Sequence, residues 1–106
     1  MASTRREMAE LPDEARNLAG FELFTVQCGR APADFKPMGT VGAGVYELRV
    51  CTRHEHRVFY VAKFAEAVYV LHVFEKRTRK TSERDLKLGQ RRYREMQELR
   101  RDEGLK

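Results

Sequence analysis

Hydrophobic and polar residues alternate along the middle of the chain with the two-residue period of β-strands. In residues 45–51, hydrophobic side chains at every second position alternate with Glu47 and Arg49, which is typical of a strand with one buried face. Residues 57–64 and 68–74 are rich in β-branched and aromatic residues and predict two more strands. Because short polar segments join the three strands, we expect hairpins and antiparallel pairing.

The last of these strands is hydrophobic on both faces, which predicts burial on both sides and a central place in the sheet. One face carries Val68, Val70, His72 and Phe74, and the other carries Tyr69, Leu71 and Val73. His72 stands on an otherwise apolar face, where a structural histidine with satisfied hydrogen bonds is more common than a catalytic one.

Helical spacing of hydrophobic residues predicts a helix on each side of the strands. The first helix begins near Asp13, after Pro12, and ends near Gly29. Its apolar stripe consists of Ala15, Leu18, Ala19, Leu23 and Val26. Gly20 lies inside this helix, either as a modest weakness or as a point of close packing. The residues before it, 1–10, are expected to form a short fraying helix or a partly ordered arm.

The second helix follows a basic turn and is predicted to run from Ser82, which can cap it, to about Leu99 or Arg101. Its hydrophobic side is narrow and consists of Leu86, Tyr93, Met96 and Leu99. Gly89 lies in the middle of this helix and is expected to loosen it. Residues 102–106 should fray.

These elements predict a single α+β domain over residues 1–106, with residues 1–10 as a frayed arm and residues 102–106 as a frayed tail. Its antiparallel sheet has three to four strands, the N-terminal helical region packs on the sheet, and the C-terminal helix is basic. A short edge strand is expected at residues 35–38, inside a connector rich in Pro and Gly. The segment Gly42-Ala43-Gly44 lacks the other residues of a phosphate-binding loop, so we interpret it as turns before the next strand.

Positive charge is concentrated in the last third of the chain. The 106 residues carry a formal net charge of +5. Residues 1–75 hold nine basic and ten acidic residues, whereas residues 76–106 hold twelve basic and six acidic ones. Such a concentration attracts nucleic-acid phosphates or an acidic protein, although a solvated helix face carries similar charge.

The composition argues against membrane-spanning and secreted proteins. No apolar run approaches about 18 residues, and the N-terminus lacks the apolar core of a signal peptide. The spacing of Cys28 and Cys51 indicates no disulfide, so a reducing cytoplasmic location is expected. Cys51, His54 and His56 lack a second pair of ligands, so we expect no metal and no other cofactor.

Four segments, in their order along the chain, resemble one protein family. They are GAGVYELRV, RVFYVAKF, YVLHVFEKRTRKT and an Arg-rich closing helix. Over residues 10–97 they resemble the RelE/HigB superfamily of bacterial toxins, and most closely its phage-related branch. The resemblance implies a small endoribonuclease that cuts messenger RNA, commonly on the ribosome. It also implies a cognate antitoxin, a helix-turn-helix protein encoded by the adjacent gene, whose acidic or amphipathic segment is expected to engage the C-terminal half.

The residues in these segments allow RNA cleavage without a metal, in which the 2′-hydroxyl of RNA attacks the adjacent phosphate. Arginine stays charged and grips phosphate, so Arg49 and Arg57, which we expect to be exposed on their strands, are candidate catalytic residues. Glu47 shares the face of Arg49 and is a base, a positioner of Arg49 or a plain ion-pair partner. Lys76 and Lys80 match the two lysines of the family's basic turn and serve as a base or as phosphate holders.

Residues that bind RNA are expected on the same strands and turn. Unstacked bases rest on aromatic rings, so Tyr60 and Phe74 are candidates, although aromatic strand residues are more often part of a core. Lys36, Arg77 and Arg79 are candidates for holding phosphates. The alternative to a toxin is a non-enzymatic, phage-derived module that binds RNA or protein, because the sequence shows no unmistakable general base.

Overall fold

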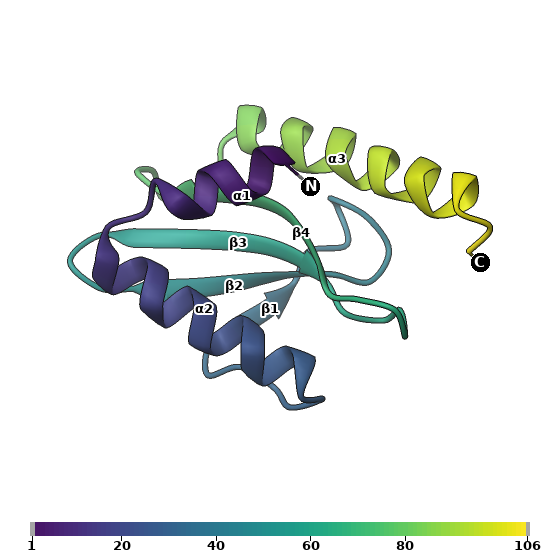
Figure 1. The fold of residues 1–106 in the computed structure, drawn as a ribbon. Coiled ribbons are helices and arrows are strands. Elements are labelled where there is room, and N and C mark those ends of the chain that lie inside the picture. Colours follow the sequence, from purple (N-terminus) through teal and green to yellow (C-terminus); the bar gives the residue numbers. More distant parts are fainter. Residues whose placement is uncertain (1, 106) are drawn as a thin grey trace.

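A computed structural model describes residues 2–105 of the chain, with side chains from Thr4 to Leu105. Met1 and Lys106, at the ends of the predicted domain, lie outside the described residues. In chain order the elements are α1 (Ala2–Ala9), α2 (Asp13–Gln27), β1 (Phe35–Pro37), β2 (Val45–Cys51), β3 (Glu55–Val61), β4 (Tyr69–Glu75) and α3 (Glu83–Asp102) (Figure 1). The strands pair antiparallel in the order β1-β2-β3-β4. The predicted α+β fold is therefore confirmed.

Helices cover both faces of the sheet and build two hydrophobic cores. Figure 1 shows α2 below the strands and α3 above them. The core under α2, here called the α2-side core, contains Leu11, Ala15, Ala19, Leu23, Val26, Leu48, Val50, Val58, Tyr60 and Val73. The core under α3, here called the α3-side core, contains Val41, Val45, Phe59, Val61, Leu71, Phe74, Tyr93 and Met96. Because side chains alternate between the two faces of the sheet, β2 and β3 each contribute residues to both cores.

A β-bulge in β4 changes which of its side chains share a face. Phe59 pairs with His72 and Tyr60 pairs with Val70, so Leu71 is an extra residue in the ladder. Beyond the bulge the alternation is shifted by one residue, and Val73 joins the α2-side core while Phe74 joins the α3-side core. The predicted grouping of Val70 with Phe74 on one face was therefore wrong.

β4 lies at an edge of the sheet, so its predicted central place was also wrong. β4 is hydrophobic on both faces because helices pack on both sides of the sheet. This pattern does not depend on how many strands pair with β4. Side chains from α1 and α3 bind the outer backbone of this edge. The Val73 N–H donates to Glu7 at 3.0 Å, and Arg92 donates to the Leu71 carbonyl at 3.1 Å. Both backbone groups are thereby satisfied without a fifth strand.

The helices differ from the sequence prediction mainly at their glycines. Ser82 caps α3 as predicted, because its hydroxyl accepts a hydrogen bond from the Asp85 N–H at 3.1 Å. Gly89 is a contact point, since a Cβ there would lie 2.8 Å from the Phe59 ring. Gly20 has no atom within 4 Å of a Cβ position, which fits a local weakness of α2. Among the described residues, no helix is long and apolar enough to cross a membrane.

Candidate functional site

A cluster of charged side chains lies on the α3 side of the sheet, where the first three strands run next to each other. Register pairs Lys36 with Glu47, and Arg49 with Arg57. The turn that precedes α3 adds Thr81, whose hydroxyl donates to Glu47 at 3.3 Å. We call Lys36, Glu47, Arg49, Arg57 and Thr81 the Glu47 cluster. It joins three strands and the start of the C-terminal helix.

Glu47 is the centre of this cluster and is fully buried. One carboxylate oxygen accepts from Arg57 Nε at 3.1 Å and lies 3.6 Å from Lys36 Nζ. The other carboxylate oxygen accepts from the Thr81 hydroxyl. Burying a carboxylate is costly unless it is paired and hydrogen-bonded, and these three contacts meet that condition. Of the roles left open for Glu47, the geometry shows the cross-strand ion pair, and its partner on β3 is Arg57.

Arg57 was expected to be exposed, and this expectation was wrong. The residue is 2% exposed, and its guanidinium donates to the carboxylates of Glu47 and Glu55 and to the His56 carbonyl. Burial follows from its place between β2 and β4, where Arg49 and Phe74 are its cross-strand neighbours. All three guanidinium nitrogens are therefore occupied by the protein itself.

Arg49 and Lys36 are the members of the Glu47 cluster that carry positive charge to the solvent. Their side chains are 37% and 40% exposed. Arg49 Nε lies 3.8 Å from an Asp34 carboxylate oxygen, and within the described residues this buried nitrogen makes no hydrogen bond. Arg49 is therefore the arginine of the cluster that can bind an anion without first breaking a buried ion pair.

The basic turn, residues 76–80, lies beside the Glu47 cluster and is hydrogen-bonded to β3. The Lys76 N–H donates to the Glu55 carbonyl at 2.8 Å. Lys76 is half-buried and lines a cavity of about 550 Å³ together with His54, Glu55, Glu75 and Arg77. Arg77 is exposed and paired with Glu75 at 2.7 Å. Arg79 and Lys80 are also exposed. The turn thus adds four cations to the surface next to the cluster.

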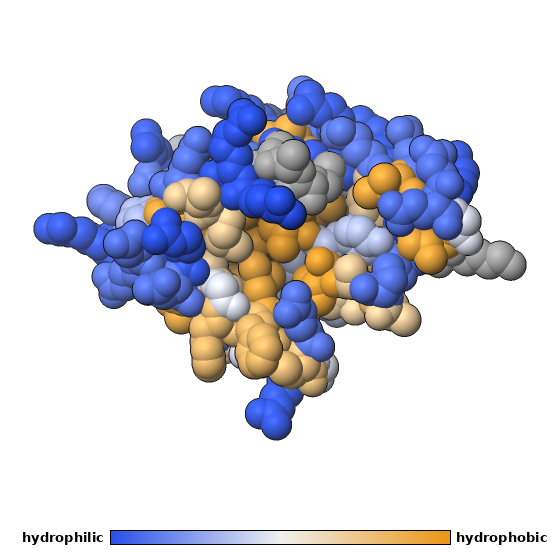
Figure 2. Space-filling view, viewed as in Figure 1, coloured by the Kyte–Doolittle hydropathy of each residue, from blue (hydrophilic) through white to orange (hydrophobic). Residues whose placement is uncertain are grey.

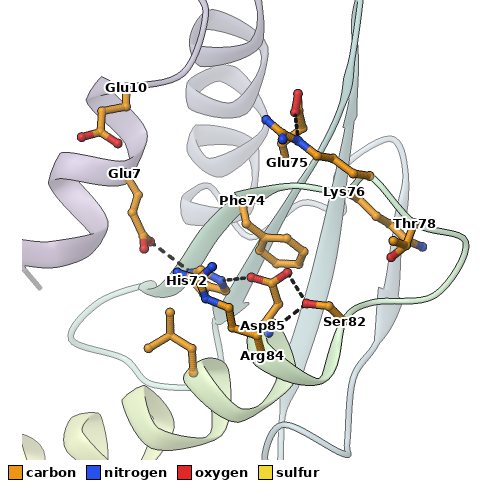
Figure 3. A pocket seen from close by; sticks show the side chains of 12 residues that line it. Glu7, Glu10, His72, Phe74, Glu75, Lys76, Thr78, Ser82, Arg84 and Asp85 are labelled. Carbon is orange, nitrogen blue, oxygen red and sulfur yellow. Dashed lines mark hydrogen bonds and ion pairs between the residues drawn. The ribbon is translucent and has the colours of Figure 1, made fainter.

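A second cavity, of about 660 Å³, opens between α1, the end of β4 and the start of α3 (Figure 3). Its wall includes Phe74, Lys76 and Arg84 and a buried set of charged groups around His72. Here His72 binds Asp85 at 2.7 Å and Glu7 at 3.3 Å, one through each ring nitrogen. Arg92 donates to Glu7 at 2.8 Å. We call His72, Glu7, Asp85 and Arg92 the His72 network.

The His72 network joins α1, β4 and α3. Burial alone would raise the pKa of Glu7, but hydrogen bonds from His72, Arg92 and the Val73 N–H together lower that pKa to about 2. Glu7 is therefore held as a carboxylate at neutral pH. With both ring nitrogens bonded inside the protein, His72 is the structural histidine that its apolar surroundings predicted.

The two aromatic candidates have different positions. Tyr60 belongs to the α2-side core, is 2% exposed and lies against Tyr46. Burial also raises the pKa of its hydroxyl to about 12. Tyr60 therefore has no free ring face for an RNA base, and its expected role was wrong. Phe74 is 9% exposed, and its ring stacks on the His72 ring with 4.6 Å between the ring centroids. Phe74 also lines the cavity.

Several groups at these sites were not predicted from the sequence, and only Glu55 had a local signal. Glu55 stands two positions before Arg57 on the same strand, so strand periodicity alone places the two on one face. The other groups have partners far away in the sequence. Thr81 binds Glu47, 34 residues away, and Arg92 binds Glu7, 85 residues away. In the part of the chain that the structure describes, no group of three His, Cys, Asp or Glu residues is placed to hold a metal ion.

The outer face of α3 carries further positive charge. A shallow hollow of about 620 Å³ is lined by Arg84, Lys87, Leu88, Gln90, Arg91 and Arg94. The four cations recur every three or four residues and therefore form one stripe along the helix. This α3 stripe begins where the basic turn ends, so the two form one surface rich in cations.

Comparison with curated proteins and with solved structures found no match. The sequence profile of the family described as "Phage derived protein Gp49-like (DUF891)" matches residues 6–94. The matched segment includes the Glu47 cluster, the basic turn and the His72 network. The chain therefore belongs to the phage-derived Gp49-like family, which in general consists of RelE/HigB-like toxins.

Proposed function

We propose that this protein is the toxin of a toxin–antitoxin system and cuts messenger RNA on the ribosome without a metal ion. The observation that carries the proposal is the Glu47 cluster. It combines a buried, fully paired carboxylate with two partly exposed cations, Lys36 and Arg49. The basic turn adds further cations next to them. Such a surface fits a phosphate group that gains negative charge during the reaction.

In the proposed reaction, the 2′-oxygen of RNA attacks the neighbouring phosphorus, and the 5′-oxygen of the next nucleotide leaves. The attacking hydroxyl loses a proton, and the leaving oxygen gains one. Arg49, Lys36 and Lys76 stabilise the charge on the crowded phosphate. Arg57 acts as a positioning residue, because it holds Glu47, which in turn contacts Lys36. Lys80, Arg77 and Arg79 hold neighbouring phosphates.

The proposal is tested with purified protein, ribosomes and messenger RNA. Arg49→Ala should lower the cleavage rate roughly 10²–10³-fold, since it removes a group that stabilises the transition state. Arg101→Ala removes one exposed cation at the far end of α3 and should leave the chemical step unchanged. Absence of cleavage and of growth arrest with the wild-type protein would refute the toxin activity. Equal losses for Arg49→Ala and Arg101→Ala, reproduced by added salt, would show that arginines only attract RNA.

A non-enzymatic RNA- or protein-binding module is the second candidate function. It is favoured by one observation, namely that Glu47 and Arg57 satisfy each other instead of facing solvent. RNA binding by the wild-type protein without any cleavage of ribosome-bound messenger RNA would select this candidate.

A further inference from the structure

We propose that the cavity between α1, the end of β4 and the start of α3 binds a guanine nucleotide of single-stranded RNA, with Glu10 and Arg84 at the two edges of the base. We call it the α1–α3 cavity. The proposal rests on the proposed function only in that RNA is the ligand, and it applies equally to a module that binds RNA without cutting it. It assigns the recognition of one base to residues outside the Glu47 cluster.

The α1–α3 cavity combines polar walls with a small apolar surface. Its volume of about 660 Å³ lies within the range of roughly 300–1,000 Å³ that is common for small-molecule sites. Phe74 and Leu88 supply apolar atoms against which a flat ring can pack. Figure 2 shows mainly hydrophilic surface at the upper left of the view, over the end of α1 and the basic turn. A flat base with polar edges fits these surroundings better than an apolar peptide segment does.

Most carboxylates of this cavity are already paired within the protein. Of the four, two belong to the His72 network, and a third, that of Glu75, accepts a hydrogen bond from Arg77 at 2.7 Å. Within the described residues, the side chains of Glu10, Arg84 and Lys76 form no hydrogen bond and no ion pair. One carboxylate and two cations of the wall are therefore available to a ligand.

The combination of a free carboxylate and a free arginine favours guanine among the four RNA bases. On its Watson–Crick edge, guanine presents the N1–H and the N2 amino group side by side, and these two donors match the two oxygens of a carboxylate. On its other edge, O6 and N7 are adjacent acceptors that an arginine binds with two hydrogen bonds. Adenine, cytosine and uracil do not offer both pairs. Glu10 and Arg84 are therefore assigned to the donor edge and the acceptor edge of guanine.

The two residues belong to elements that the His72 network holds together. Glu10 follows α1 directly, and Arg84 lies in the first turn of α3 (Figure 3). Both side chains are exposed and can turn toward a bound base, because exposed side chains change rotamer freely. The network bonds α1 and α3 to β4 and to each other, so the backbone around the cavity is fixed.

Lys76 connects the α1–α3 cavity with the Glu47 cluster. It lines this cavity and also the cavity of about 550 Å³ that contains Glu55, which binds Arg57. Phe74, in the wall of the α1–α3 cavity, is a cross-strand neighbour of Arg57. A phosphate of the bound nucleotide can therefore contact Lys76 while the RNA strand continues toward the cluster.

The test measures binding of nucleoside 5′-monophosphates to the full-length protein by calorimetry. The guanosine nucleotide should bind roughly tenfold or more tightly than the adenosine, inosine and 7-deazaguanosine nucleotides. Inosine lacks the N2 amino group, and 7-deazaguanosine lacks N7. Glu10→Ala should therefore abolish the preference over inosine and keep the preference over 7-deazaguanosine, and Arg84→Ala should do the reverse.

Each variant has a control that makes the same change of charge at an exposed position outside the cavity. Glu14→Ala on α2 and Arg101→Ala on α3 should keep both preferences. Circular dichroism should show that all four variants are folded.

Three results would overturn the proposal. They are no saturable binding of the guanosine nucleotide up to about 10 mM, equal binding of the adenosine nucleotide, or equal losses in the control variants. Cleavage of ribosome-bound messenger RNA is measured separately. Guanine preference without cleavage would refute only the toxin activity, whereas cleavage without guanine preference would refute only this site.

Discussion

Arg49 and Arg57 face each other across β2 and β3, yet their surroundings give them different tasks. Arg57 is buried and donates hydrogen bonds to Glu47, Glu55 and the His56 carbonyl. Arg49 keeps a partly exposed guanidinium with one distant carboxylate, that of Asp34. The partly exposed Arg49 can contact an anion from solvent, whereas the buried Arg57 is bonded to the Glu47 carboxylate.

This difference predicts that the two arginines contribute unequally to the free energy of unfolding. Arg57→Ala should lower the free energy of unfolding by about 3–5 kcal/mol, because it leaves the buried Glu47 carboxylate without its main partner. Arg49→Ala should change that free energy by less than about 1 kcal/mol, since surface ion pairs contribute little. Urea unfolding followed by circular dichroism measures both values. Similar losses in the two variants would contradict the assigned roles.

The two helical glycines provide a second contrast between residues of one type. Gly20→Ala should raise the free energy of unfolding by about 0.5–1 kcal/mol, because α2 gains helix propensity and the new methyl group meets no atom. Gly89→Ala should lower it by about 1–3 kcal/mol, because the methyl group would lie 2.8 Å from the Phe59 ring. Thermal unfolding of both variants decides the signs. Stabilisation by Gly89→Ala would show that the Phe59 ring can move aside.

At the scale of elements, one carboxylate of α1 binds both β4 and α3. Glu7 binds His72, Arg92 and the backbone of β4. The pKa of Glu7 is lowered from its ordinary value of 4.5 to about 2 in the folded protein. A carboxyl group with a lowered folded-state pKa stabilises the fold above its unfolded pKa, and this contribution is lost as the pH falls through the folded value.

Glu7→Gln should therefore lower the free energy of unfolding by about 1–2 kcal/mol at pH 7, with allowance for partial exposure of the side chain. The difference from the wild-type protein should persist to about pH 5 and shrink between pH 4.5 and pH 2. Urea unfolding at pH 7, 5 and 3 measures this trend. Glu10→Gln, at an exposed neighbouring position, is the control and should have little effect at any pH. A difference that grows toward low pH would refute the assigned ion pairs.

Elements with local signals could be predicted from the sequence, and those that depend on distant contacts could not. Alternation placed Glu47 and Arg49 on one face of β2, and Ser82 marked the start of α3, because both signals lie within a few residues. The bulge at Leu71 is defined by the pairing of β4 with β3, and no neighbouring residue in the sequence is typical of a bulge. The packing of α1 on β4 depends on partners of Glu7 that lie 65 and 85 residues away, and the burial of Arg57 depends on the pairing of β3 with β2 and β4. Site residues were therefore predicted by type and strand, while their exposure was not.

At the scale of the whole molecule, positive charge and hydrophobic surface lie on different sides. The basic turn and the α3 stripe form the cationic surface, and Phe21 and Phe24 are exposed on α2. If RNA binds the cationic surface as we propose, its affinity should depend on salt, because phosphate contacts release counterions.

The α3 stripe should therefore be visible in the salt dependence of RNA affinity. The triple variant Lys87→Ala, Arg91→Ala, Arg94→Ala should reduce the slope of log K against log salt by about 2, or roughly 0.7 per lost contact with single-stranded RNA. Filter binding at several salt concentrations gives the slope. A double variant, Arg5→Ala and Arg16→Ala, removes two cations outside the α3 stripe and should leave the slope unchanged. Equal changes in both variants would mean that only net charge matters.

The position of α1 has a consequence for the order in which the protein is completed. Glu7 is synthesised before two of its partners, His72 and Arg92, which follow 65 and 85 residues later. Thr81 likewise reaches Glu47 only after the strands have been made. Because synthesis proceeds from the N-terminus, Glu7 lacks these two partners while the last third of the chain is unmade. A protein that we propose to cut messenger RNA on the ribosome thus lacks part of its folded structure while it is attached to the ribosome that makes it.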